Sequence, residues 1–391
     1  MKKKSIKQRN RDVLLGIAHR QGKFSRKTRK NNLLAITVGN LGASDLEQWL
    51  TKHLHAGDLN IEIGKYKEIT LHLPEIMNFS THYEQTVIHL SAIRKLVSTQ
   101  DTLYAPKLRL VRFDQLKSIS TSASIALTAE LSRWDDHINH GLRPRLETWD
   151  KSIITQLNEF GFFKLFAIDT IPPKFLLSDS STNIRYVPYI KGKKGEKHHR
   201  ATLKTEIEKV AGDEIEKWLI LSSGLSEAIT NVSHHAYPAD FDCADQDKCW
   251  YMGGSFDKRD STLRVVFFDQ GIGIPKSLPT SKIWENILDL MSQLSIPYAE
   301  QKKDAVLLKA AVEYERTSTN KEDRGKGLQD LLNFIRERGD GYLSILSQKG
   351  LFKYSLESGT ESTKSESFSN PLQGTLIIWK VQLTNTQDQR P

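Results

Sequence analysis

The stretch LSSGLSEAITNVSHHAYP (residues 221–238) places one carboxylate, one amide and two imidazoles within nine positions, at Glu227, Asn231, His234 and His235. At about 100° per residue, the hydrophobic residues of this region form one stripe of a helix. The stripe comprises Trp218, Leu221, Leu225, Ala228, Ile229, Val232 and Ala236. Glu227, Asn231 and His234 fall on the opposite side, where residues four apart are neighbours. The pattern predicts a helix with one face in a core and one face that either binds a ligand or is simply solvated.

A glycine motif follows in VVFFDQGIGIP (residues 265–275), where an apolar run ends at Asp269 and leads into Gly271 and Gly273. The run predicts a strand, and glycines at its end let the main chain approach a ligand closely because they have no side chain. The carboxylate at the end of the strand can accept a hydrogen bond from an exocyclic amine. This segment is therefore a candidate binding turn.

A second glycine motif occurs in DRGKGLQDLLNFI (residues 323–335), where Gly325 and Gly327 precede a predicted helix. The apolar stripe of that helix comprises Leu328, Leu331, Leu332 and Ile335. Free N–H groups and the helix dipole make such a helix N-terminus an anion site. Arg324 and Lys326 would add positive charge there.

The three segments EAITNVSHHA, DQGIGIP and RGKGL, in this order, resemble the N box and the two glycine boxes of the GHKL ATPase superfamily, which includes gyrase, MutL proteins and histidine kinases. The nearest likeness is to anti-sigma-factor serine kinases. The resemblance covers residues 183–384, about half of the chain, and includes the closing strand around Gly374 and Thr375. It implies a two-layer α/β sandwich of the Bergerat type that binds ATP and Mg²⁺.

The resemblance also implies roles for individual residues. Asn231 would coordinate Mg²⁺, Glu227 would orient or deprotonate the attacking nucleophile, and Asp269 would bind the adenine amino group. The residues expected to line the nucleotide or its phosphates are Gly271, Gly273, Gly325, Gly327 and Leu328. His234 departs from the family, because many relatives have Lys or Arg at that position. The segment ERTSTNKEDRGKG (residues 315–327) is expected to form a lid, in which Thr317, Ser318 and Thr319 either contact phosphate or belong to a polar loop.

The first part of the chain is predicted to be a separate α/β domain. Strands are expected at residues 33–40, 60–64, 67–75 and 108–113, and helices at residues 82–97 and 122–138. Two prolines and a polar cluster in IPPKFLLSDSSTN predict a boundary near Pro173. The expected divisions are a basic, disordered tail at 1–31, an α/β domain at 32–172, the ATP-binding domain at 173–384 and a C-terminal tail at 385–391.

LRLVRFDQLKSISTSASIALTAEL (residues 108–131) has a weak resemblance to STAS domains, the substrates of anti-sigma kinases. Ser120 stands where that family has an aspartate, and the likeness implies that Ser122 is a phosphoacceptor. The alternative, which we favour, is that these Ser and Thr residues cap a helix by accepting hydrogen bonds from free N–H groups.

Charge and cysteine content restrict the function further. Residues 1–30 hold twelve Lys or Arg and one acidic residue, a balance of +11; the whole chain is +9, so residues 31–391 carry −2. The basic segment is either a solubilising arm or, as a less favoured alternative, a contact for nucleic acid. Two cysteines and no run of eighteen apolar residues predict a cytoplasmic protein without membrane association. Zinc bound by His234, His235, Cys243 and Cys249 is not favoured, because C-x5-C differs from the short zinc-knuckle spacing.

The sequence therefore predicts a signalling or regulatory protein that binds ATP and Mg²⁺ and slowly hydrolyses ATP or transfers phosphate to a protein Ser or Thr. The alternatives are a non-catalytic switch, in which ATP gates a protein interaction, and a nucleic-acid adaptor that acts through the basic segment. The protein partner is not identified by the sequence, and a homodimer is expected only by analogy with GHKL relatives.

Overall fold

The computed structural model describes most of the chain. The described residues are 44–100, 102–178, 183–196, 199–212, 218–241, 243–281, 283–318 and 327–383. The basic tail predicted at 1–31, the strand predicted at 33–40 and the C-terminal tail at 385–391 lie outside these ranges. Within them the fold is mixed α/β, as predicted.

The central feature is a five-stranded antiparallel sheet with the strand order β6-β7-β8-β10-β9. The strands are β6 (Ile184–Lys193), β7 (Cys249–Asp257), β8 (Thr262–Asp269), β9 (Gly341–Glu357) and β10 (Thr360–Gln382). All five lie within the segment predicted as the second domain. β8 occupies the middle of the sheet, so its end is flanked by β7 on one side and β10 on the other.

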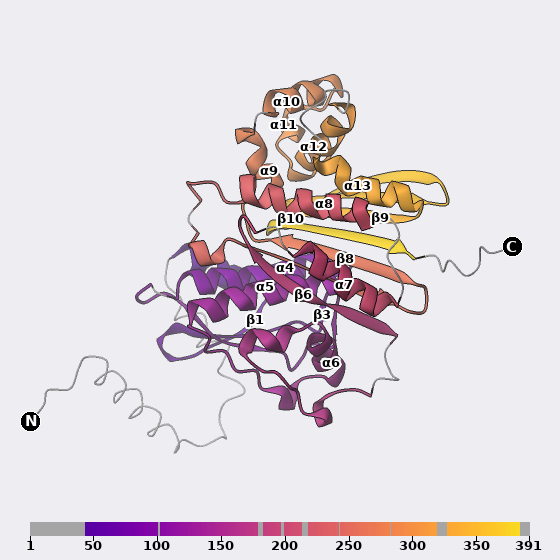
Figure 1. Ribbon diagram of the computed structural model, residues 1–391. Coiled ribbons are helices and arrows are strands. Elements are labelled where there is room, and N and C mark those ends of the chain that lie inside the picture. The colour runs from indigo at the N-terminus through magenta and orange to yellow at the C-terminus, as the bar shows by residue number, and fades with distance from the viewer. Residues whose placement is uncertain are drawn as a thin grey trace, which may run out of the picture.

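Helices cover one face of this sheet, which we call the front face (Figure 1). They are α7 (Arg200–Ala211), α8 (Trp218–Asn231), α9 (Ile274–Ser277), α10 (Trp284–Gln293), α11 (Tyr298–Gln301), α12 (Asp304–Ser318) and α13 (Gly327–Arg338). The predicted stripe of α8 is confirmed, since Leu221, Leu225 and Ile229 are almost fully buried. Leu331 and Ile335 are likewise buried on α13, which lies beside α8.

The N-terminal unit covers the opposite, rear face of the sheet (Figure 1). Its helices are α3 (Asp45–His55), α4 (Tyr83–Ser98), α5 (Thr121–His137) and α6 (Lys151–Glu159). Its strands are β1 (Asn60–Ile63), β2 (Glu68–His72), β3 (Ile76–Met77), β4 (Lys107–Arg112) and β5 (Ser118–Ile119), which form sheets of order β1-β2-β4 and β3-β5. The alternation predicted for β1 and β2 is confirmed, because Ile61, Ile69 and Leu71 are buried.

The N-terminal unit and the rear face of the sheet share one hydrophobic core. Tyr251 and Phe268 of the sheet belong to the same buried cluster as Val87 of α4 and Ile125 of α5. As a result, every residue of β7 is buried. A strand covered on both faces is expected to have a continuous apolar run instead of an alternating one, which explains the VVFF sequence of β8. The chain boundary near Pro173 does not separate two cores.

The hairpin of β9 and β10 extends well beyond the closing strand expected around Gly374 and Thr375. Its pairing continues to a turn at Ser358 and Gly359, both with positive φ. A register shift in β10 follows Ser367, and this irregular segment contacts the N-terminus of α4. There the Glu84 carboxylate accepts hydrogen bonds from the main-chain N–H groups of Ser369 (2.6 Å) and Asn370 (3.0 Å).

Within the described ranges, no helix is both long enough and apolar enough to cross a lipid bilayer.

Candidate functional site

The predicted Gly-x-Gly turn holds the end of β8 against the π-helical turn Val232–Ala236, which follows α8. The Ile272 N–H donates to the Ala236 carbonyl oxygen at 2.9 Å. A Cβ atom on Gly271 would collide with that same carbonyl oxygen, so only glycine fits at this point. Gly271 therefore supports the turn against the helix instead of facing a cavity.

The irregular part of β10 supports the turn from the other side. Gly374 has φ +93°, and a Cβ atom there would collide with the Asp269 carbonyl oxygen. Its own carbonyl oxygen accepts a hydrogen bond from the Ser347 hydroxyl at 2.8 Å, and the same hydroxyl oxygen accepts from the Ile274 N–H at 3.0 Å. The backbone around Asp269 is thus fixed by β10, β9 and α8 together.

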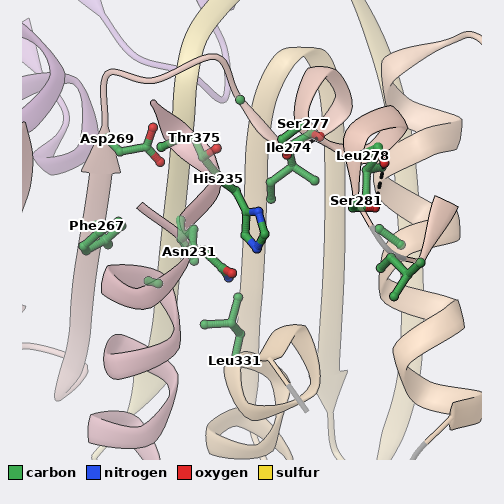
Figure 2. A pocket seen from close by; sticks show the side chains of 16 residues that line it. Asn231, His235, Phe267, Asp269, Ile274, Ser277, Leu278, Ser281, Leu331 and Thr375 are labelled. Carbon is green, nitrogen blue, oxygen red and sulfur yellow. Dashed lines mark hydrogen bonds between the residues drawn. The ribbon is translucent and has the colours of Figure 1, made fainter. Parts of the chain in front are cut away.

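Strand alternation directs the Asp269 side chain towards the front face. Val265 and Phe267 of β8 pack among the front helices, whereas Val266 and Phe268 pack among the rear ones. Asp269 therefore projects on the same side as Phe267. Its register partner on β10 is Thr375, whose side chain lies beside the carboxylate in Figure 2.

Burial makes Asp269 an unusual carboxyl group. The residue is only 4 % exposed, and its Oδ1 accepts a hydrogen bond from the Gly271 N–H at 2.8 Å. Desolvation raises the pKa of Asp269 from 3.8 to about 6, although hydrogen bonds from Gly271 and Thr375 and the charge of Arg94 oppose this rise. A hydrogen-bond donor from a ligand would favour the charged form of this carboxyl group.

The carboxyl group opens into a cavity between the sheet, α8, α9 and α13 (Figure 2). Its open space is about 800 Å³ including the part that faces solvent. The lining is mainly apolar, and the polar side chains in it are Asn231, His235, Asp269, Ser277, Ser281 and Thr375. The apolar lining residues are Ala228, Ala236, Phe267, Ile274, Leu278, Ile283, Ala311, Leu331 and Ile377, together with Gly273. Mostly apolar walls with a few polar groups are typical of small-molecule sites.

The residues selected from the sequence do not all reach this cavity. Asn231, Asp269 and Gly273 line it, while Glu227 lies one helical turn before Asn231 on α8 and is not among the lining residues. Gly327 and Leu328 begin α13, one turn before the cavity residue Leu331, and their side chains are outside the description. Arg324, Gly325, Lys326 and Thr319 lie outside the described residues, as do the side chains of Thr317 and Ser318.

His235 is a cavity residue that the helical projection did not select. The chain continues from α8 into a π-helical turn, Val232–Ala236. His235 is four residues after Asn231, so the two side chains are neighbours along the helix. His235 points into the cavity beside Asn231 (Figure 2), whereas His234 is not among the lining residues, although both residues are exposed. Desolvation, followed by the neighbouring His234, lowers the pKa of His235, which favours the neutral imidazole at pH 7.

The residues considered for zinc do not converge. Cys249 is buried, and its thiol donates to the Gln246 carbonyl oxygen at 3.2 Å. Across the described part of the chain, no group of three or more His, Cys, Asp or Glu side chains could hold a metal ion.

The serines considered as phosphoacceptors lie at the start of α5. Ser120 is the N-cap, and its hydroxyl oxygen accepts a hydrogen bond from the Ala123 N–H at 3.2 Å. The cap that we favoured is therefore confirmed. Ser122 is 8 % exposed and Ser124 is fully buried.

Comparison of the chain with models of protein families, with curated proteins and with solved structures finds no match in any of the three.

Proposed function

We propose that this protein binds ATP together with Mg²⁺ in the cavity at the end of β8, and that it hydrolyses ATP slowly or transfers the terminal phosphoryl group to a protein. The observation that carries the proposal is the convergence of Asn231, Asp269, Gly273 and Leu331 on one cavity from four separate elements. An antiparallel sheet with helices on its front face is also the arrangement expected of a Bergerat-type GHKL domain, which supports the same proposal.

The chemistry of the cavity fits an adenine ring at the Asp269 end. Asp269 presents a carboxylate whose ionised form is poorly solvated, and Thr375 presents a hydroxyl group beside it. The exocyclic amine of adenine would donate to this carboxylate, replacing the water that burial removed. Ile274, Ile377 and Leu331 supply apolar contact for a flat aromatic ring.

Asn231 fits the role of metal ligand because its amide oxygen is the type of donor that Mg²⁺ prefers. When bound, Mg²⁺ neutralises charge on the phosphate oxygens, which is the main requirement of phosphoryl transfer. Glu227, one turn earlier on the same helix, would orient the attacking nucleophile. The N-terminus of α13 at Gly327 would offer main-chain N–H groups to the phosphates.

The serines of α5 are poor candidates for the phosphoacceptor. Ser122 and Ser124 of the N-terminal unit are buried, so their hydroxyl groups are inaccessible in this fold. The acceptor would therefore be an exposed Ser or Thr.

Calorimetry with a non-hydrolysable ATP analogue, with and without Mg²⁺, tests the proposal directly. We expect binding that is strengthened by Mg²⁺, and we expect the Asn231→Ala variant to lose this strengthening. Product analysis with ATP then separates free phosphate from phosphoprotein. If no adenine nucleotide binds at millimolar concentration, the proposed function is wrong.

A non-catalytic switch is the second candidate, and the rear face of the site favours it. Arg94 of the N-terminal unit donates to the carbonyl oxygen of Gln270, the residue after Asp269, at 3.4 Å. A ligand that shifts this turn would therefore shift its contact with the N-terminal unit. The Glu227→Gln variant separates the two candidates, since a switch keeps its partner response and an enzyme loses turnover.

A further inference from the structure

A second cavity lies behind the Gly-x-Gly turn, on the rear side of the sheet. It is formed by α4 and α5 of the N-terminal unit together with α9, Phe241, Cys243 and the Pro371–Gln373 segment of β10. Its open space is about 1090 Å³ including the part that faces solvent. None of its lining residues belongs to the front cavity.

Positive charge dominates the lining of this rear cavity. Among the described residues that line the cavity, Arg94, Lys95, Arg133 and Lys276 contribute four cations and Glu130 contributes one carboxylate, a balance of +3. Arg94 is 8 % exposed, and its Nε donates to Glu130 at 3.0 Å. The Nε of Arg133 lies 3.0 Å from Oδ2 of Asp247, so counting that neighbouring carboxylate still leaves an excess of +2.

A concave site with this excess charge selects a compact anion. We propose that the rear cavity binds a small phosphomonoester, with its phosphate near Arg94, Arg133 and Lys276. A phosphate monoester carries about −1.5 to −2 charges near pH 7, which matches the excess. Arg94 already donates from Nε and Nη2 to Glu130 and from Nη1 to Gln270, so Arg94 would contribute charge and the direct hydrogen bonds to phosphate would come from Arg133 and Lys276. Leu90, Phe241 and Leu372 provide an apolar wall for the organic part of the ligand.

Two residues that line the rear cavity also bind the turn that leads into the front cavity. Arg94 holds the Gln270 carbonyl oxygen, and Gln348 donates from Nε2 to the Ile272 carbonyl oxygen at 2.6 Å. Lys276 belongs to α9, which begins at the front-cavity residue Ile274. A ligand that draws Arg94 and Lys276 together would therefore alter the turn on which Asp269 is mounted. This coupling rests on the proposed nucleotide site, whereas binding in the rear cavity does not.

Cys243 provides a readout that needs no nucleotide. It lines the rear cavity and is half-buried, whereas Cys249, the other cysteine of the chain, is 1 % exposed. Alkylation of the full-length protein by neutral N-ethylmaleimide would be followed by mass spectrometry, with and without phenyl phosphate. We expect phenyl phosphate to slow alkylation of Cys243 several-fold, and benzoate, a monoanion of similar shape, to have little effect.

Two substitutions of exposed lysines, one in the rear cavity and one outside it, test the site. Lys276→Gln should raise the phenyl phosphate concentration needed for protection roughly tenfold, the usual effect of losing one charge-assisted hydrogen bond. Lys309→Gln removes an exposed lysine from α12, away from both cavities, and should leave protection unchanged. Absence of protection, or equal protection in the Lys276→Gln and wild-type proteins, would overturn the proposal.

A further variant distinguishes this site from the nucleotide site. Asn231→Ala alters the front cavity alone, so phenyl phosphate should still protect Cys243 in it. Loss of protection in Asn231→Ala would instead place the phosphate in the front cavity and refute the rear site. Failure of ATP to bind, with protection intact, would refute the proposed function and leave the rear site standing.

Discussion

The substitution Asp269→Asn tests the proposed site more sharply than any other change, because it should remove one pH-dependent contribution to stability and weaken ligand binding at the same time. The asparagine has the same shape, and its side-chain oxygen can still accept the hydrogen bond from the Gly271 N–H. What it removes is the negative charge of a residue that is only 4 % exposed.

The magnitude follows from the pKa of Asp269. A rise from 3.8 to about 6 means that folding favours the protonated form. The associated stability is fully present below pH 4 and is lost as the pH rises through about 6, where the folded carboxyl group ionises. Over the whole window this loss is about 3 kcal/mol, since one pKa unit corresponds to about 1.4 kcal/mol. Roughly half of it falls between pH 5 and pH 8.

The assay is urea unfolding of both proteins at pH 5 and pH 8, followed by tryptophan fluorescence. Trp250 pairs with Asp269 across β7 and β8 and so lies next to the substitution. The amide NH₂ group of the asparagine faces the hydrogen-bond donors of Thr375. This mismatch lowers the free energy of unfolding of the variant by about 1–3 kcal/mol at every pH. We therefore compare differences: the free energy of unfolding of Asp269→Asn, relative to wild type, should increase by about 1.5 kcal/mol from pH 5 to pH 8.

Nucleotide titration of the same variant completes the test. Loss of a hydrogen bond to a charged acceptor is worth about 1.5–3 kcal/mol, so ATP should bind roughly 10- to 100-fold more weakly. An unfolding difference that is equal at pH 5 and pH 8 would refute the raised pKa. ATP affinity equal to that of wild type would refute the contact between Asp269 and adenine.

The remaining predictions concern the helix, the turn and the N-terminal segment. Glu227→Gln should keep ATP binding and lose phosphate release, and normal turnover would remove its catalytic role. Asn231→Ala should weaken binding measured with Mg²⁺ roughly tenfold and change binding in EDTA little. Gly271→Ala should lower the free energy of unfolding by about 1–3 kcal/mol and weaken ATP binding, because its methyl group meets a main-chain carbonyl oxygen. Gly359→Ala, in the open hairpin turn, is the control and should leave ATP binding intact. Deleting residues 1–30 should abolish any salt-dependent nucleic-acid binding in a filter assay, and unchanged binding would dismiss that adaptor role.

Much of the local structure could be predicted from the sequence, because local structure depends on periodicity and on glycine. The stripe containing Leu225 and Ile229 predicts α8 and its buried face, and the alternation of Ile69 and Leu71 predicts β2. Asp269 was selected because an apolar run stopped at a carboxylate before two glycines. In each case the deciding interactions lie within a few residues along the chain.

Other features depended on contacts that are distant in sequence. The role of Gly271 is set by Ala236, a residue from a different element, so the motif alone did not distinguish a supporting glycine from a lining one. A projection at 100° per residue places His235 at the edge of the apolar stripe, whereas in the structure His235 lies in a π turn and lines the cavity. The rear cavity depends on Arg94, whose partner Glu130 lies on another helix.

The sequence by itself determined the α/β class, the faces of its helices and the residue types at the candidate site, because hydrophobic periodicity and turn chemistry act over short distances. Only the tertiary structure decided that the N-terminal unit covers the rear of the sheet, that Asp269 loses its solvent, and that a cationic cavity forms behind it. Burial and charge environment arise from segments brought together by packing, and a carboxyl group's pKa depends on those surroundings more than on its neighbours in the chain.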